Sequence, residues 1–128
     1  MQVRRVLLVL LLCGIGVLVN GCIVIAAGAG AGTVAYVTGS LEGVESKNVD
    51  TIYKATERAA GELGLVTTEK TKDVLSARII ARDAQDKRVT IKLKALAEES
   101  TKISVRVGFW GDEVKSRLIY QKIQDNLK

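Results

Sequence analysis

Histidine is absent from this chain of 128 residues, and the sequence contains only two cysteines. Without histidine the chain lacks the usual general base, the Ser-His and Cys-His nucleophile pairs, and the commonest zinc ligand. Two cysteines build neither a disulfide framework nor a four-thiolate metal site. The residue types therefore indicate no catalytic residue, no metal site and no cofactor, and the length accommodates one domain of ordinary size.

Charged residues are also absent from a long N-terminal stretch, because the first one after Arg4 and Arg5 is Glu42. The run that follows the two arginines, residues 6–12, reads VLLVLLL and is entirely apolar. A basic start, a short apolar run and a boundary of small residues are the parts of a secretory signal peptide. We therefore expect residues 1–21 to be a signal peptide that precedes the folded domain.

The boundary of this segment resembles the processing site of bacterial lipoproteins. Residues 18–22 read LVNGC, with an aliphatic residue three positions before the cysteine and a small residue directly before it. The resemblance implies that Cys22 is joined to diacylglycerol, that the chain is cut before it, and that the new amino group is acylated. Two or more acyl chains anchor a protein stably. In Gram-negative lipoproteins an aspartate after the cysteine retains the protein in the inner membrane, so Ile23 at this position implies the outer membrane.

Alternatives remain for the segments around Cys22. Residues 6–25 match the roughly 20 residues that a retained membrane-spanning helix needs. Residues 22–32 are interpreted as a lipidated cysteine followed by an apolar tether, which either acts as a flexible spacer or packs through its small residues. Loss of residues 1–21 removes Arg4 and Arg5, which leaves 17 basic against 14 acidic side chains. This mild excess, together with export, argues against nucleic-acid binding.

Residues 33–128 are predicted to form one small α+β domain. The expected order is a strand at 33–41 with Gly39 as a bulge, a helix after Asn48 or Ser46, four strands, and a terminal helix after Asp112. The four later strands are placed at 65–74, 75–83, 88–97 and 101–109. Alternating apolar and polar residues predict an antiparallel sheet of four to five strands with two helices packed on one face.

The terminal helix and the strand before it are each expected to turn one apolar side toward the core. In the strand, Phe109 continues the inward series and is predicted to close the end of the core. For Trp110 both roles stay open, closing the core or anchoring a partner or a membrane interface, because an aromatic side chain at a tip can do either. The predicted inward stripe of the helix consists of Val114, Leu118, Ile119, Ile123 and Leu127.

Six basic side chains occupy the polar positions of three successive strands: Arg78, Arg82, Lys92, Lys94, Lys102 and Arg106. By parity they share one face of the sheet, and no carboxylate of the same parity lies within those three runs. Like charges facing each other across strands are destabilising, so a counter-charge from a partner is expected. The alternative is an ordinary solvated face whose lysines prevent strand pairing.

Residues 106–112 read RVGFWGD, and Ser116 follows in the next helical turn. Glycines at 108 and 111 permit a sharp strand-to-helix turn, while Arg106 is expected to pair with Asp112 or to bond turn carbonyls. The alternative is an anion-binding corner at Gly111 and the helix N-terminus. Ser116 has no histidine to activate it and is not predicted to be a nucleophile.

This stretch resembles the end of a family of small Gram-negative lipoproteins with a domain of unknown function, which carries an R-V-G-x-x-G-D-x-x-x-S motif. Tyr53, Ala59 and residues 63–65 extend the resemblance, which covers roughly residues 33–127. It implies a location and a fold but no activity. We therefore expect a lipid-anchored, non-catalytic structural or adaptor protein with an anionic envelope component or an acidic protein as partner. The alternative is a module that binds an anionic ligand or glycan at the basic sheet face or the Gly111 turn.

Overall fold

The computed structural model describes residues 2–8 and 34–128, and the statements below concern these residues. The chain divides into two compact units, Met1–Gly30 and Ala31–Lys128. Residues 2–8 are helical. The predicted lipidation site at Cys22 and the tether at 22–32 lie outside the described residues. None of the helices found in the described ranges combines the length and the apolar character needed to cross a membrane.

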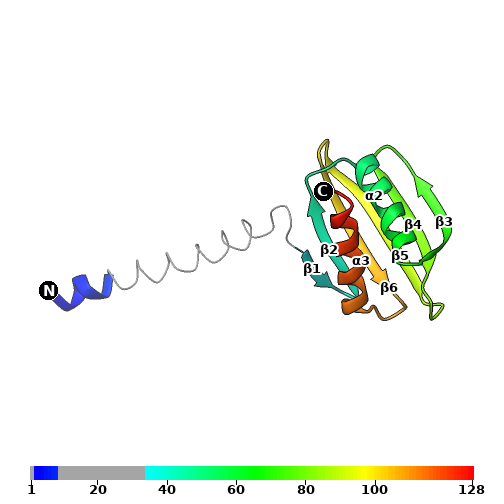
Figure 1. Cartoon of the computed structure of the whole chain (residues 1–128). Coiled ribbons are helices and arrows are strands. Elements are labelled where there is room, and N and C mark those ends of the chain that lie inside the picture. Colours follow the sequence, from blue (N-terminus) through cyan, green and yellow to red (C-terminus); the bar gives the residue numbers. More distant parts are fainter. Residues whose placement is uncertain (1, 9–33) are drawn as a thin grey trace. The chain divides into compact units, whose positions relative to one another are not determined.

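Six antiparallel strands form one sheet, in the order β1-β2-β6-β5-β4-β3 (Figure 1). The strands are β1 (Val34–Val37), β2 (Ser40–Glu45), β3 (Val66–Lys72), β4 (Ser76–Arg82), β5 (Arg88–Ala97) and β6 (Ser100–Val107). Two helices, α2 (Val49–Glu62) and α3 (Glu113–Asp125), lie side by side on one face. The predicted α+β class and the placement of both helices on one face are confirmed.

The predicted strand count of four to five is wrong, because residues 33–41 do not form one strand. They contain β1, a two-residue turn and the start of β2, which pair as a hairpin with Val37 opposite Ser40. The turn residues Thr38 and Gly39 have φ values of 50° and 81°. Positive φ at both central residues is the backbone of a tight hairpin turn, whose twist matches that of the flanking strands. Gly39 therefore reverses the chain instead of marking a bulge.

The predicted start of the first helix is confirmed at Asn48. The Asn48 side chain accepts a hydrogen bond from the backbone nitrogen of Thr51 at 2.8 Å and so caps one of the free N–H groups of α2. Gly64 follows the last turn with a φ of 69°, a conformation in which glycine carries no steric penalty. Strand β5 has the predicted bounds, and β3 is a polar strand at the edge of the sheet.

The core lies between the sheet and the two helices. Its largest fully buried side chains include Leu41, Ile52, Ile79, Ile91, Ile103 and Ile123. Tyr120 of α3 is buried over Gly43 of β2, and its hydroxyl donates a hydrogen bond to the Glu45 carboxylate at 2.9 Å. Gln124 donates to the same carboxylate oxygen at 2.7 Å. These bonds satisfy polar groups at the edge of the core, which would otherwise be costly to bury.

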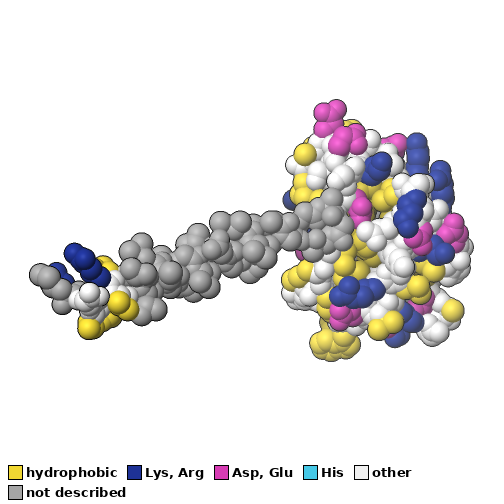
Figure 2. Space-filling model, turned by 60° about the vertical axis from the view of Figure 1, so that its left-hand side comes forward, with side chains coloured by type: hydrophobic (Ala, Val, Ile, Leu, Met, Phe, Trp, Pro, Cys, Tyr) yellow, Lys and Arg dark blue, Asp and Glu magenta, His cyan; other side chains and the backbone are white. Residues whose placement is uncertain are grey.

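Ile119, Ile123 and Leu127 of the predicted inward set lie in or against the core, whereas the inward placement predicted for Phe109, Val114 and Leu118 is wrong. Phe109 does not close the core, because Gly108 adopts a φ of 73° and turns the chain out of the sheet, leaving Phe109 79% exposed. Val114 and Leu118 are exposed as well. Each helical residue advances by about 100°, which places these two away from the buried stripe of Ser116, Ile119, Tyr120 and Ile123. Figure 2 shows hydrophobic side chains projecting at the lower end of the domain, where the β6–α3 connection lies in Figure 1.

Candidate functional site

The candidate site is the outer face of the sheet, defined as the face turned away from α2 and α3. Strand residues that alternate with the buried core positions point to this face. On β4, Arg78 and Arg82 alternate with buried Ala77, Ile79 and Ala81. On β5 and β6 the alternation is equally regular over the relevant positions. The structure therefore brings all six sequence-predicted residues to the outer face: Arg78, Arg82, Lys92, Lys94, Lys102 and Arg106.

The strand register places like charges opposite each other on this face. Arg78 pairs with Lys92 across β4 and β5, and Lys94 pairs with Lys102 across β5 and β6. A third opposed pair, Arg82 and Arg88, lies where β4 ends and β5 begins. Arg88 was absent from the predicted set, although its parity with Lys92 in the sequence is a signal that finds it. Opposed cations repel and lower the stability of the sheet.

Carboxylates reach the outer face from strands that the prediction did not consider. Glu42 of β2 makes a salt bridge with Lys102 at 3.2 Å. Glu69 of edge strand β3 lies opposite Ile80 of β4, at the margin of the outer face that is farther from Glu42. The charge of the face is therefore partly balanced at its two margins, while its centre on β4 and β5 stays basic. Within residues 34–128, Arg78, Arg88 and Lys92 take part in none of the salt bridges.

A hollow of about 260 Å³ lies at this basic centre and is open to solvent. Its lining comes from four strands and comprises Ser40, Arg78, Ile80, Arg88, Thr90, Lys92, Ser104 and Arg106. Four cationic side chains and three hydroxyl groups are donors for an anion, and no carboxylate is part of the lining. Ile80 is only 5% exposed although it belongs to the outer face, so it gives the hollow an apolar floor.

Arg106 joins this hollow to the adjoining turns. Its guanidinium donates to the carbonyl of Phe109 at 2.6 Å and to the carbonyl of Thr38 at 3.4 Å. Of the two partners expected for Arg106, the structure therefore shows the turn carbonyls. The same two turns approach closely, because a side chain at Gly111 would collide with the backbone of Gly39. Arg106 thus fixes the β1–β2 hairpin to the β6–α3 connection.

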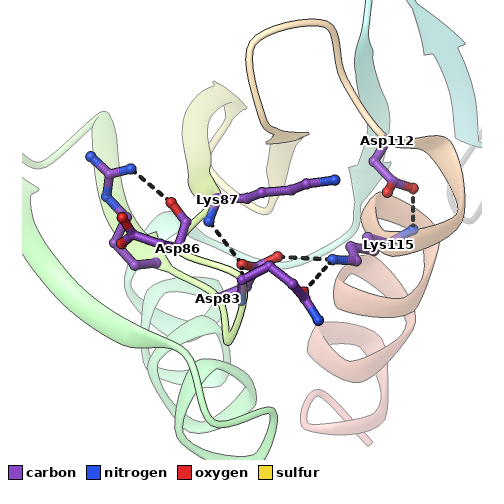
Figure 3. Close-up of polar contacts among 7 residues, drawn as sticks. Asp83, Asp86, Lys87, Asp112 and Lys115 are labelled. Atoms are coloured by element: carbon purple, nitrogen blue, oxygen red, sulfur yellow. Dashed lines mark hydrogen bonds and ion pairs between the residues drawn. The ribbon is translucent and has the colours of Figure 1, made fainter.

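The alternative anion site at the Gly111 turn is already filled by a carboxylate of this chain. Asp112 caps α3 and accepts a hydrogen bond from the backbone nitrogen of Lys115 at 3.0 Å (Figure 3). The negative Asp112 carboxylate stands at the position where a helix N-terminus would receive an anion. The open hollow is therefore the better-supported anion site of the two.

Lys115 ties the beginning of α3 to the β4–β5 turn. Its ammonium donates to the Asp83 carboxylate at 3.0 Å and to Gln85 at 2.7 Å (Figure 3). The backbone nitrogens of Gln85 and Lys87 donate to the other Asp83 oxygen at 2.9 Å. The bond from Lys115 lowers the pKa of the Asp83 carboxyl below its ordinary value. Because the donors and acceptors of this cluster are paired with one another within the chain, we infer that the cluster stabilises the fold.

A model of the family described as a protein of unknown function (DUF3568) matches residues 5–126. The chain belongs to this family. The matched region contains the whole outer face of the DUF3568 domain and also includes the N-terminal segment from Arg5. A search of curated proteins found no significant match.

Ser116, the candidate nucleophile that the sequence raised, lies apart from the hollow. Ser116 lies on the buried side of α3 and is fully buried, and its hydroxyl has no hydrogen-bond partner. Its burial keeps it from any substrate in solvent. In residues 2–8 and 34–128, no group of three or more histidine, cysteine, aspartate or glutamate side chains is placed to hold a metal ion.

Proposed function

We propose that this DUF3568 protein is a non-catalytic structural or adaptor lipoprotein of the bacterial envelope whose outer sheet face holds an anionic partner. The observation that carries the proposal is the two opposed cation pairs on β4 and β5 at the centre of that face, Arg78 with Lys92 and Arg82 with Arg88. Each pair is destabilising on its own, and an anionic surface relieves the repulsion. An anionic envelope polymer or an acidic protein has the complementary charge.

The lipid anchor is tested by the intact mass and membrane fractionation of the native chain beside Cys22→Ser. We expect a mature chain that begins at an acylated Cys22 and pellets with the outer membrane, and we expect the variant to lose both properties. A native chain with the unmodified mass of all 128 residues would overturn the anchor. It would favour a retained N-terminal helix at residues 6–25.

The outer face is tested by charge reversal. The test variant changes four of its cations: Arg78→Glu, Arg82→Glu, Lys92→Glu and Lys94→Glu. Polyphosphate and lipopolysaccharide serve as anionic probes and dextran as a neutral one, with binding measured by calorimetry at low and high salt. We expect the native chain to bind an anionic probe more weakly as salt rises, since salt screens exposed charges. The variant should lose this binding, together with any acidic protein cross-linked to the native chain in cells.

A matched control distinguishes binding by the outer face from binding that depends only on the net charge of the domain. It reverses four exposed cations elsewhere on the domain: Lys47→Glu, Lys54→Glu, Arg58→Glu and Lys128→Glu. Both variants carry the same change in formal charge, so binding that depends only on net charge falls equally in both. The proposal requires the control to keep the binding that the test variant loses. Equal binding by native chain and test variant would refute the role of the outer face.

The second candidate is a module for a small anionic ligand or glycan, and the hollow favours it. A space of about 260 Å³ with clustered cations and hydroxyls is matched to one anionic group better than to a flat polymer. In that case inorganic phosphate alone raises the melting temperature of the native chain, and Arg88→Ala with Lys92→Ala abolishes the increase. Arg106 is a poor choice for this test, because its bonds to Thr38 and Phe109 hold the fold.

A further inference from the structure

The β6–α3 connection exposes two large aromatic side chains. Phe109 is 79% exposed and Trp110 is 86% exposed, and they are the only phenylalanine and the only tryptophan of the chain. Their ring centres are 4.9 Å apart in an edge-to-face arrangement. We call this pair the aromatic tip. Aromatic side chains of this size normally bury 150–250 Å² each, so the tip leaves an unusual apolar area in water.

The backbone beneath the aromatic tip is held in place. The carbonyl of Phe109 accepts the 2.6 Å hydrogen bond from Arg106, which is itself anchored to Thr38. Gly39 packs beside the carbonyl of Trp110, where an added Cβ would come within 2.9 Å. These contacts hold the two rings outward from the end of the sheet, so their exposure is a property of the fold.

The surroundings of the aromatic tip suit a lipid surface. Exposed apolar side chains continue into α3, with Val114 at 80% and Leu118 at 54% exposure. The two carboxylates that follow the tip along the chain are occupied, since Asp112 caps the helix and Glu113 pairs with Arg117 at 2.8 Å. No unpaired carboxylate at the tip therefore opposes contact with phospholipid headgroups.

The proposed lipid anchor lies within reach of the tip. Eleven residues lie between Cys22 and Val34, and the twelve Cα–Cα steps of that extended chain span at most about 40 Å. Strand β1 has four residues, or about 13 Å, and ends at the hairpin turn that Arg106 ties to the tip. A bilayer that holds acyl chains on Cys22 is therefore close enough to meet the tip.

We propose that the aromatic tip inserts into the interfacial layer of the membrane to which this protein is anchored. Tryptophan favours the membrane–water interface, where its ring is partly desolvated and its N–H keeps a polar partner. Contact at the tip would orient the domain and hold the outer face at a set angle to the membrane. The inference rests on the lipid anchor of the proposed function.

Trp110 supplies its own probe, because it is the sole tryptophan. The native lipidated chain is reconstituted in neutral phosphatidylcholine vesicles, so that attraction between the basic face and anionic lipid does not contribute. We expect blue-shifted Trp110 emission, protection from iodide in the water, and quenching by phospholipid brominated on its acyl chains. Sedimentation with the vesicles is measured on the same samples.

A matched control moves the tryptophan to the opposite end of the sheet. The variant combines Trp110→Ser with Val74→Trp, since Val74 is 90% exposed in the β3–β4 turn beside the β5–β6 hairpin. Its emission should stay accessible to iodide and insensitive to brominated lipid. Quenching at both positions would overturn the inference, as would a native chain that sediments with vesicles while Trp110 stays accessible to iodide. A native chain that does not sediment would overturn the inference and the lipid anchor together.

Discussion

Gly43→Ala tests the contact between β2 and α3 that fills one side of the core. A methyl group at Gly43 would lie 2.7 Å from both Tyr120 Cζ and Val34 Cγ1, and closer still to the Tyr120 hydroxyl. Carbon atoms in good contact are about 3.5–4.0 Å apart, so the neighbours must move by roughly 1 Å. Overpacking of this kind costs about 1–3 kcal/mol of unfolding free energy.

A compensating gain reduces the net effect. Replacing a strand glycine by alanine removes about 0.5–1 kcal/mol of conformational penalty. We therefore expect a net destabilisation of about 1–2 kcal/mol, which lowers the melting temperature of a domain of this size by roughly 4–15 °C. Far-ultraviolet circular dichroism of a fragment of residues 31–128 follows both urea and thermal unfolding. It is preferable to fluorescence, because exposed Trp110 changes its surroundings little on unfolding.

Two further variants make the interpretation specific. Gly61→Ala places a methyl group where nothing lies within 4 Å, so it should stabilise α2 by about 0.5–1 kcal/mol. Tyr120→Phe removes the atom nearest to the new methyl group, so Gly43→Ala should cost less in that background than in the native one. A Gly43→Ala fragment as stable as the native one would refute the packing argument, as would an equal cost in both backgrounds.

Two other predictions concern polar groups of the fold. Ser116→Ala removes a buried hydroxyl without a partner and should raise the unfolding free energy by about 1 kcal/mol in urea, whereas a loss of stability would reveal a hydrogen bond at Ser116. Lys115 lowers the pKa of Asp83 in the folded state. The ionised Asp83 carboxylate therefore stabilises the fold above its unfolded pKa of about 3.9, and this stabilisation is lost as pH falls through the folded pKa. The urea midpoint of Asp83→Asn should therefore fall less steeply than that of the native fragment below about pH 4, and identical slopes would contradict the role of the Asp83–Lys115 bond.

The features that depend on neighbours along the chain were predictable from the residue pattern alone. Alternation at every second residue placed Arg78, Lys92 and Arg106 on one face, and the side chain of Asn48 marked a helix start. These features are readable because period and capping involve residues only two to four positions apart. The α+β class follows from the same patterns.

Which of those residues come into contact depends on the pairing of strands that are distant along the chain. Glu42 neutralises Lys102 although 60 positions separate them, because β2 pairs with β6. Phe109 continues the alternation of its strand, yet the turn at Gly108 carries it into solvent. Strand order and turn direction arise from contacts between distant segments, which no local period records. The basic face was therefore predictable from the sequence, while its hollow, its flanking carboxylates and the aromatic tip emerged only from the packed fold.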